Sequence, residues 1–476
     1  MGKFLSCGKF NKHYKYILLA VIFGLISTII FGKGYCKDSK YIYIARVYPE
    51  ETEKIQIALS HHIIIRNIYR NFGILIISII LLYYEKYSLK SKRDEENAKN
   101  NNGIELIYED TLEELEKKSL LNIIFVIILF NIRDILNILY YQYDLDEFDI
   151  WTFDLLFFAY FNYKILKIKI YSHHKFVLYL SIIACLISKM IYLLVQILSD
   201  DYKDNIYNKH KFFYLIDIFS YLLIIALRTY TVTKIKEFID FKYISSTKLL
   251  IINGIIGIFI NIIIMLIFSF NKCASVDDID IHLCNVVDIV DNNNREETYL
   301  DNFFIYFKIL NHSINIGRYH EIIIEVFTSL FGTLTYTFCI YFYILIIRYL
   351  GTVHTIFYNL TYAFSVRIIY LLISGTTKSN DNKHHLIWVY LMPMEFYFFS
   401  GFGIFVYCEI IELNFCNFQY NLRKNIIKRG EDDFKINRES EGNSSLNDED
   451  EDKETETENN DSLSINYCEF QNKKKK

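Results

Sequence analysis

Residues 248–270 read KLLIINGIIGIFINIIIMLIFSF, and this stretch decides the class of fold to which the chain belongs. The run continues for 23 positions, and Lys248 is its only charged residue. Because an α-helix rises about 1.5 Å per residue, a run of this length crosses the ~30 Å hydrocarbon core of a bilayer. The stretch therefore predicts a membrane-spanning helix.

Nine further apolar stretches of comparable length lie before and after it. The chain of 476 residues is 52% hydrophobic, which agrees with a membrane protein that also carries sizeable polar loops. We expect an all-α membrane protein with ten transmembrane helices, over residues 16–32, 62–84, 120–140, 150–166, 176–198, 212–231, 248–270, 321–347, 353–374 and 386–410.

The connections between these stretches alternate in charge, and the alternation predicts their orientation. Residues 144–149 contain no base, and the charged residues of 277–301 are mostly acidic. Residues 33–54 are mixed, with five bases offset by four acids. Lysine and arginine gather in the other connections and flanks, at 1–15, 85–118, 164–175, 234–248 and 423–429. Since basic loops remain in the cytosol, both ends of the chain are expected there.

Ten spans divide into two halves of five. Because each half has an odd number of spans, the second half is expected to cross the membrane in the opposite orientation to the first. The loop 85–118 and the tail are charged and poor in apolar residues, so both are expected to be largely disordered. Within the loop, 110–118 predicts a short interfacial helix. Residues 299–312 are apolar enough to lie on the bilayer or cap the bundle. The expected units are a cytosolic N-terminal arm (1–15), a first five-helix half (16–198, with the cytosolic loop 85–118), a second half (199–420, with the extracytosolic loop 271–320) and a disordered charged tail (421–476).

Three stretches carry a resemblance to a known family. They are the fourth span with its exit (152–185), residues 355–369 and residues 401–416. These resemble the drug/metabolite transporter superfamily, in the EamA-like branch that holds the nucleotide-sugar transporters, where a short basic turn separates the fourth and fifth helices. The resemblance implies two inverted five-helix halves. It also implies a cavity lined by the first four spans and by the sixth to ninth, with the fifth and tenth as scaffold.

Ionisable residues inside spans are the first candidates for a solute path, because each costs about 2.5–3.5 kcal/mol on insertion scales. Two alternatives stay open: long arginine side chains near a span end can reach the interface, and neighbouring opposite charges can neutralise each other. Neutral hydrogen-bonding groups that could orient a sugar or nucleotide form a second set. The substrate-binding candidates are Arg66, Arg70, Arg133, Asp134, Asp154, Asp217 and Arg367, and then Asn253, Asn261, Tyr358 and Asn359.

Cysteine and histidine give weaker indications. Cys273 and Cys284 share the external loop, where they are a candidate disulfide or two unrelated thiols. Three pairs of adjacent histidines occur, at 61–62, 173–174 and 384–385, and adjacent side chains on a helix face different ways. We therefore expect no metal site. No phosphate-binding loop or nucleophile motif is present, so neither a cofactor nor an enzyme activity is expected.

The sequence favours a carrier that moves a small organic solute, such as a nucleotide sugar or sugar phosphate, by alternating access. A serpentine receptor and a membrane scaffold without substrate are the alternatives. The expected partners are membrane lipid and the solute, with a homodimer left open and no nucleic acid, because no basic aromatic surface is present. The terminal lysines Lys473–Lys476 match a dilysine retrieval signal for the endoplasmic reticulum or Golgi, or form an ordinary low-complexity end.

Overall fold

The structure is a computed structural model that describes residues 5–7, 12–32, 43–44, 63–99, 117–142, 152–198, 212–242, 244–272, 286–289, 296–299, 301–315, 317, 319–377, 401–413, 418–422 and 425. Cys273, Cys284 and almost all of the expected tail 421–476 lie outside these residues. The same holds for residues 378–400, which include the start of the expected tenth span.

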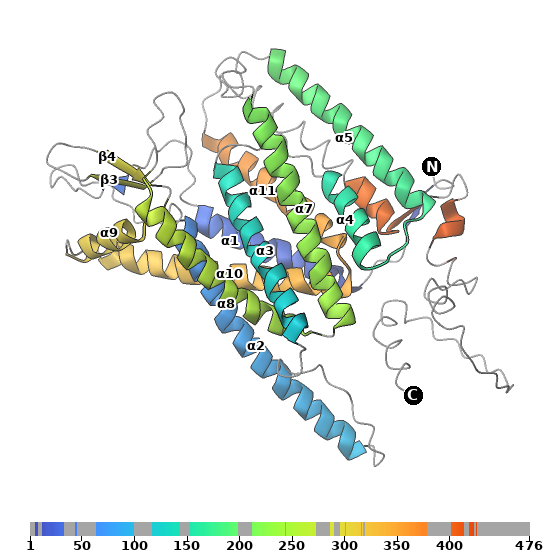
Figure 1. The fold of residues 1–476 in the computed structure, drawn as a ribbon, viewed down its shortest axis with the longest axis horizontal. Helices are drawn as coiled ribbons and strands as arrows, with labels where there is room; N and C mark the ends of the chain where they lie inside the picture. Colours follow the sequence, from blue (N-terminus) through green and yellow to red (C-terminus); the bar gives the residue numbers. More distant parts are fainter. Residues whose placement is uncertain are drawn as a thin grey trace.

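The described chain is mostly helical, as the apolar stretches predict (Figure 1). Among the described residues, five helices are long and apolar enough to cross a membrane, over Ile64–Tyr87, Leu120–Asn137, Ile218–Phe241, Ser246–Phe270 and Ser329–Tyr349. Residues 401–407 are helical as well. The named helices are α1 (Lys15–Gly32), α2 (Ile63–Lys99), α3 (Lys117–Gln142), α4 (Thr152–Ile165), α5 (Ser172–Leu198), α7 (Phe212–Phe241), α8 (Ser246–Phe270), α9 (Phe303–Asn315), α10 (Tyr319–Tyr349) and α11 (His354–Thr377).

Helix α2 corrects one expectation, because it continues to Lys99 and so takes in the first part of the loop 85–118. Residues 85–99 contain no proline or glycine and are rich in glutamate and lysine, which are good helix formers. Adding a residue to an existing helix costs far less than starting one, so the span extends into its polar flank. The expected interfacial helix at 110–118 lies outside the described residues, apart from the two lysines that begin α3.

Short strands, which the apolar pattern did not predict, join distant parts of the chain. β1 (Leu5–Cys7) pairs antiparallel with β5 (Ile411–Leu413), and the single-turn helices η1 (Lys12–Tyr14) and η5 (Phe418–Asn421) lie nearby in sequence. β2 (Tyr43–Ile44) pairs parallel with β3 (Val286–Ile289), which pairs antiparallel with β4 (Glu296–Tyr299). Figure 1 shows β3, β4 and α9 at one end of α8.

Helix α9 caps that end of the bundle. Ile305 and Tyr306 of α9 are buried against Ile64 of α2 and Met265 of α8. The carboxylate of Asp301 accepts hydrogen bonds from the backbone N–H groups of Ile64 at 2.7 Å and of Ile65 at 3.4 Å. A remote side chain thus satisfies the first donors of α2 and places a negative charge at the positive end of its dipole. The apolar segment 299–312 caps the bundle, one of its two expected roles.

The most extensive contacts between helices form a pattern that is kept when two sets of four helices are exchanged. In chain order this exchange replaces α1 to α4 by α7, α8, α10 and α11. The exchange turns the contact between α1 and α10 into the contact between α7 and α3. It likewise turns the contact between α4 and α7 into the contact between α11 and α1. The contact of α2 with α10 becomes α8 with α3, and α2 with α8 maps onto itself. All of these contacts occur in the structure.

Glycines allow α2 and α8 to approach closely. A Cβ atom on Gly254 would lie 3.0 Å from the backbone N and Cα of Leu75, which leaves no flexible atom to move aside. A Cβ atom on Gly257 would lie 2.4 Å from Oδ1 of Asn71. Small residues at helix contacts are a general means of association in lipid, where no hydrophobic force drives helices together.

We predict that Gly254→Ala destabilises the protein by roughly 1–3 kcal/mol, because the α2 and α8 backbones must move apart to admit the methyl group. Thermal unfolding of the purified protein in detergent measures the effect. Gly401→Ala is the matched control, since a Cβ atom there meets nothing within 4 Å. Equal melting temperatures for the two variants would contradict the close helix contact.

Candidate functional site

A polar cavity of about 160 Å³ lies where α2, α3, α8 and α10 meet. Its lining contrasts with the helices that build it, because amide side chains gather there from runs that are otherwise apolar. The lining residues are Asn67, Arg70, Asn71, Ile74, Phe130, Asn131, Asp134, Ile135, Asn137, Asn253, Asn261, Tyr336 and Ile340.

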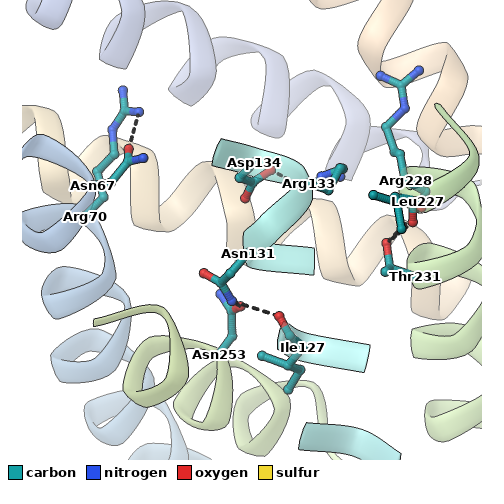
Figure 2. A network of polar contacts seen from close by, with 10 residues as sticks. All are labelled: Asn67, Arg70, Ile127, Asn131, Arg133, Asp134, Leu227, Arg228, Thr231 and Asn253. Atoms are coloured by element: carbon teal, nitrogen blue, oxygen red, sulfur yellow. Dashed lines mark hydrogen bonds and ion pairs between the residues drawn. The ribbon is translucent and has the colours of Figure 1, made fainter. Parts of the chain in front are cut away.

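Hydrogen bonds to the preceding helical turn hold several of these amides in place. The Nδ2 group of Asn131 donates to the carbonyl of Ile127 and to Oδ1 of Asn253, each at 3.0 Å, which ties α3 to α8 (Figure 2). Asn261 donates in the same way to the carbonyl of Gly257 at 2.7 Å. Asn261 is 2% exposed, and its Oδ1 accepts no hydrogen bond from the described residues. A buried acceptor of this kind is a ready partner for a solute hydroxyl or N–H group.

One cation and one anion accompany the amides. The guanidinium of Arg70 lies 4.4 Å from the ring centre of Tyr336, a cation–π contact. Asp134 forms an ion pair with Arg133, which stacks on Phe130 with 4.1 Å between the guanidinium carbon and the ring centre. The Asp134 side chain is 36% exposed and that of Arg133 is 10% exposed. Of the two, the carboxylate is therefore the group open to the cavity.

The structure brings four of the substrate-binding candidates together in this cavity: Arg70, Asp134, Asn253 and Asn261. Arg133 joins them indirectly through Asp134, and Arg66 is buried one turn earlier on α2.

The other candidates lie elsewhere. Tyr358 on α11 is buried, and its hydroxyl contacts Sγ of Cys339 at 3.1 Å, while the neighbouring Asn359 is half-buried. Neither lines the cavity. Asp217 belongs to α7 and Arg367 to α11, and the positions of their side chains are not described.

The sequence reading missed most of the amides, namely Asn67, Asn71, Asn131 and Asn137, as well as Tyr336. Asparagine and tyrosine are abundant throughout this chain, and that abundance makes any one of them uninformative. A usable signal was present in their spacing. Asn67 and Asn71 stand four residues apart on one face of α2, in the run that also holds Arg66 and Arg70.

Asp154 has a different partner, which the sequence did not indicate. Its carboxylate is fully buried and forms an ion pair with Arg228 of α7, and the Arg228 side chain is 16% exposed. Both residues lie apart from the cavity lining. The pair joins α4 to α7, so its role is structural. Figure 2 shows Arg228 on α7 beside Thr231, away from the amides of α3 and α8.

A second cluster of polar groups lies at the start of α5. The rings of His173 and His174 have centroids 4.0 Å apart, and Nε2 of His173 lies 3.5 Å from Oε1 of Glu409. The expectation that adjacent histidines face different ways is wrong here, because both belong to the first helical turn and rest against residues 407–409. Burial, with a smaller contribution from His173, lowers the pKa of His174 to about 3, so this imidazole is neutral at pH 7.

We predict that Arg228→Met alone destabilises the protein by roughly 3–5 kcal/mol, since it leaves the buried carboxylate of Asp154 without its counter-charge. The double variant Asp154→Leu with Arg228→Met should recover most of that loss, because it removes both charges. Thermal unfolding in detergent compares the three proteins.

Lys234→Met is the matched control on the same helix. Lys234 pairs with Glu237 at 2.6 Å, and their side chains are 19% and 24% exposed. Removing this pair should cost no more than about 1 kcal/mol. A double variant less stable than Arg228→Met would show that the ion pair itself, rather than its charge balance, is required.

Comparison with known proteins adds no family to this geometry. No protein-family model matches the chain, and no curated protein matches it in sequence. The function must therefore be argued from the cavity and from the arrangement of the helices around it.

Proposed function

We propose that this protein is a membrane carrier that moves a small polar solute by alternating access, with ten spans in two inverted five-helix halves of the kind found in the drug/metabolite transporter superfamily. The observation that carries the proposal is the position of the polar cavity. Two of its helices, α2 and α3, come from the first half, and two, α8 and α10, come from the second.

These four helices are also the ones that replace each other when the halves are exchanged. α2 corresponds to α8, and α3 corresponds to α10, so the cavity lies where an axis relating the halves would pass. In carriers built from inverted repeats, a site on that axis opens to one side of the membrane or the other as the halves rock. A cavity inside one half would lack this property.

Inversion of the second half is supported by the direction of α2 and α8. Near the end of its apolar run, Glu85 of α2 accepts a 2.7 Å hydrogen bond from Thr247 at the start of α8. At the other end, Ile64 and Met265 share one buried cluster. The two helices are therefore antiparallel, which is the relation that an odd number of spans per half produces.

Outward-facing side chains on these helices support a lipid environment. On α8, Phe259 is 67% exposed, and Leu266 is 49% exposed. On α10, Phe327 and Leu330 are each 67% exposed. Continuous apolar faces of this kind are rare on soluble monomers, whereas lipid tails cover them at no cost.

The lining chemistry favours a small solute with balanced charge. Amides offer both donors and acceptors, and the charges of Arg70 and Asp134 oppose each other. The volume of about 160 Å³ is below the roughly 300–1,000 Å³ of pockets for drug-sized ligands. An amino acid or a monosaccharide suits this cavity better than a nucleotide sugar, whose diphosphate would need more than one cation.

We predict that Asn253→Leu lowers the rate of solute uptake by roughly tenfold or more, because the lost polar contacts are worth about 1–3 kcal/mol. Leucine has the same branching and the same number of side-chain heavy atoms as asparagine, so it keeps the overall shape of the side chain. Purified protein in liposomes, tested with a panel of amino acids, monosaccharides, sugar phosphates and nucleotide sugars, provides the measurement.

Asn359→Leu makes the same chemical change on α11 outside the cavity lining and is the matched control. It should transport at close to the wild-type rate. A wild-type protein that moves no member of the panel, or equal rates for the two variants, would count against the carrier and its site.

The orientation of the chain has its own test. Asn294→Ser completes an acceptor for N-glycosylation at Asn292, in the segment expected outside the cytosol. In a glycosylating host we expect one added glycan on this variant, seen as a mass shift that glycosidase removes. The natural acceptors Asn443 and Asn460 of the tail should remain bare. Glycans on the tail would place the C-terminus on the wrong side for ten spans.

A further inference from the structure

The cluster formed by His173, His174 and Glu409 brings together ligands from two parts of the chain that are far apart in sequence. Each residue offers one ligand atom, and these atoms all lie within 4.8 Å of one another. Two ligands come from the first turn of α5, and the third follows the helix at 401–407. None of the three lines the amide cavity, so the solute site does not account for them.

The burial of His173 is the first observation that points to a ligand site. The residue is 1% exposed, and neither of its ring nitrogens has a hydrogen-bond partner among the described residues. A buried imidazole nearly always satisfies at least one nitrogen, since an unmade hydrogen bond costs about 1–3 kcal/mol. Its Nε2 lies 3.5 Å from Oε1 of the Glu409 carboxylate.

The backbone of Glu409 is the second sign. The helix at 401–407 ends with a 3.1 Å bond from the N–H of Glu409 to the carbonyl of Val406 and a 2.8 Å bond from Ile410 to Phe405. This is a Schellman ending, in which the residue at the position of Glu409 takes a left-handed conformation and is usually glycine. Glu409 holds a φ of +56°, which is costly for a side chain with a Cβ atom. Non-glycine residues in this conformation are concentrated at functional sites.

The separation of the His173 and Glu409 ligand atoms suits a first-row metal ion. Zinc binds imidazole nitrogen and carboxylate oxygen at about 2.0–2.2 Å, which puts tetrahedral ligand atoms roughly 3.3–3.5 Å apart. The distance between Nε2 of His173 and Oε1 of Glu409 falls at 3.5 Å. Two imidazoles disfavour calcium and magnesium, which take oxygen ligands.

We propose that His173, His174 and Glu409 bind a zinc ion, with water in the fourth position, and that this ion clamps the start of α5 to the segment after the helix at 401–407. The two segments are already in close contact. A Cβ atom on Gly403 would lie 2.2 Å from Oγ of Ser181, and Val177, Val406 and Leu413 form one buried cluster. The ion would lock the two scaffold elements and leave the solute cavity untouched.

The test uses the full-length protein in detergent, stripped with a chelator and then titrated with Zn²⁺ or Co²⁺ alone. We expect about one Zn²⁺ per chain by elemental analysis and a rise in melting temperature when Zn²⁺ is added. Co²⁺ should give the visible ligand-field spectrum of four- or five-coordinate cobalt, which Zn²⁺ then abolishes. These measurements need no variant, and a wild-type protein that binds neither ion would overturn the proposal.

Glu409→Gly is the sharpest variant, because glycine relieves the left-handed backbone while it removes the ligand. Without a metal role it should be neutral or stabilising. We expect it to fold, to lose at least tenfold in Zn²⁺ affinity and to show no shift in melting temperature with Zn²⁺. His173→Gln should behave alike, whereas His61→Gln, in another adjacent histidine pair, should bind as the wild type does. Unchanged affinity in Glu409→Gly would refute the site.

Discussion

The close antiparallel contact between α2 and α8 is the constraint on which the rest of the structure depends. Lipid tails are as apolar as leucine, so helices in a bilayer associate through tight packing and hydrogen bonds rather than through hydrophobic burial. Gly254 and Gly257 allow this contact by leaving room for Leu75 and Asn71. The approach of the two helices then sets where α3 and α10 can lie, and the cavity is the space that their polar side chains keep open.

Charged side chains in this bundle either pair with each other between helices or line the cavity, and the partner of each side chain distinguishes the two cases. Asp154 and Arg228 neutralise each other and join α4 to α7. Asp134 has a cation beside it as well, yet its carboxylate stays partly exposed at a cavity rich in amides. Amides are less costly than charges at membrane depth, because each can donate to a carbonyl of its own helix and still present an oxygen. This favours recognition of a solute through hydrogen bonds rather than net charge.

The two ends of the bundle are closed by different means. At one end, Asp301 caps α2 and α9 covers the apolar ends of α2 and α8. At the other, the β1–β5 pair joins the first and last parts of the described chain, and the histidine cluster joins the start of α5 to Glu409.

The sequence alone determined the class of fold and the approximate limits of the apolar helices, because the length and hydrophobicity of a run are local properties. It did not determine that α2 would continue to Lys99, where helix propagation outweighs polarity. It identified Arg70 and Asp134 by their charge, yet it passed over Asn67, Asn71 and Asn131, which a biased composition hides. Which face of a helix meets which neighbour, which charge Asp154 finds and whether His173 reaches Glu409 were decided only by the tertiary structure. These are relations between segments far apart in sequence, and packing alone sets them.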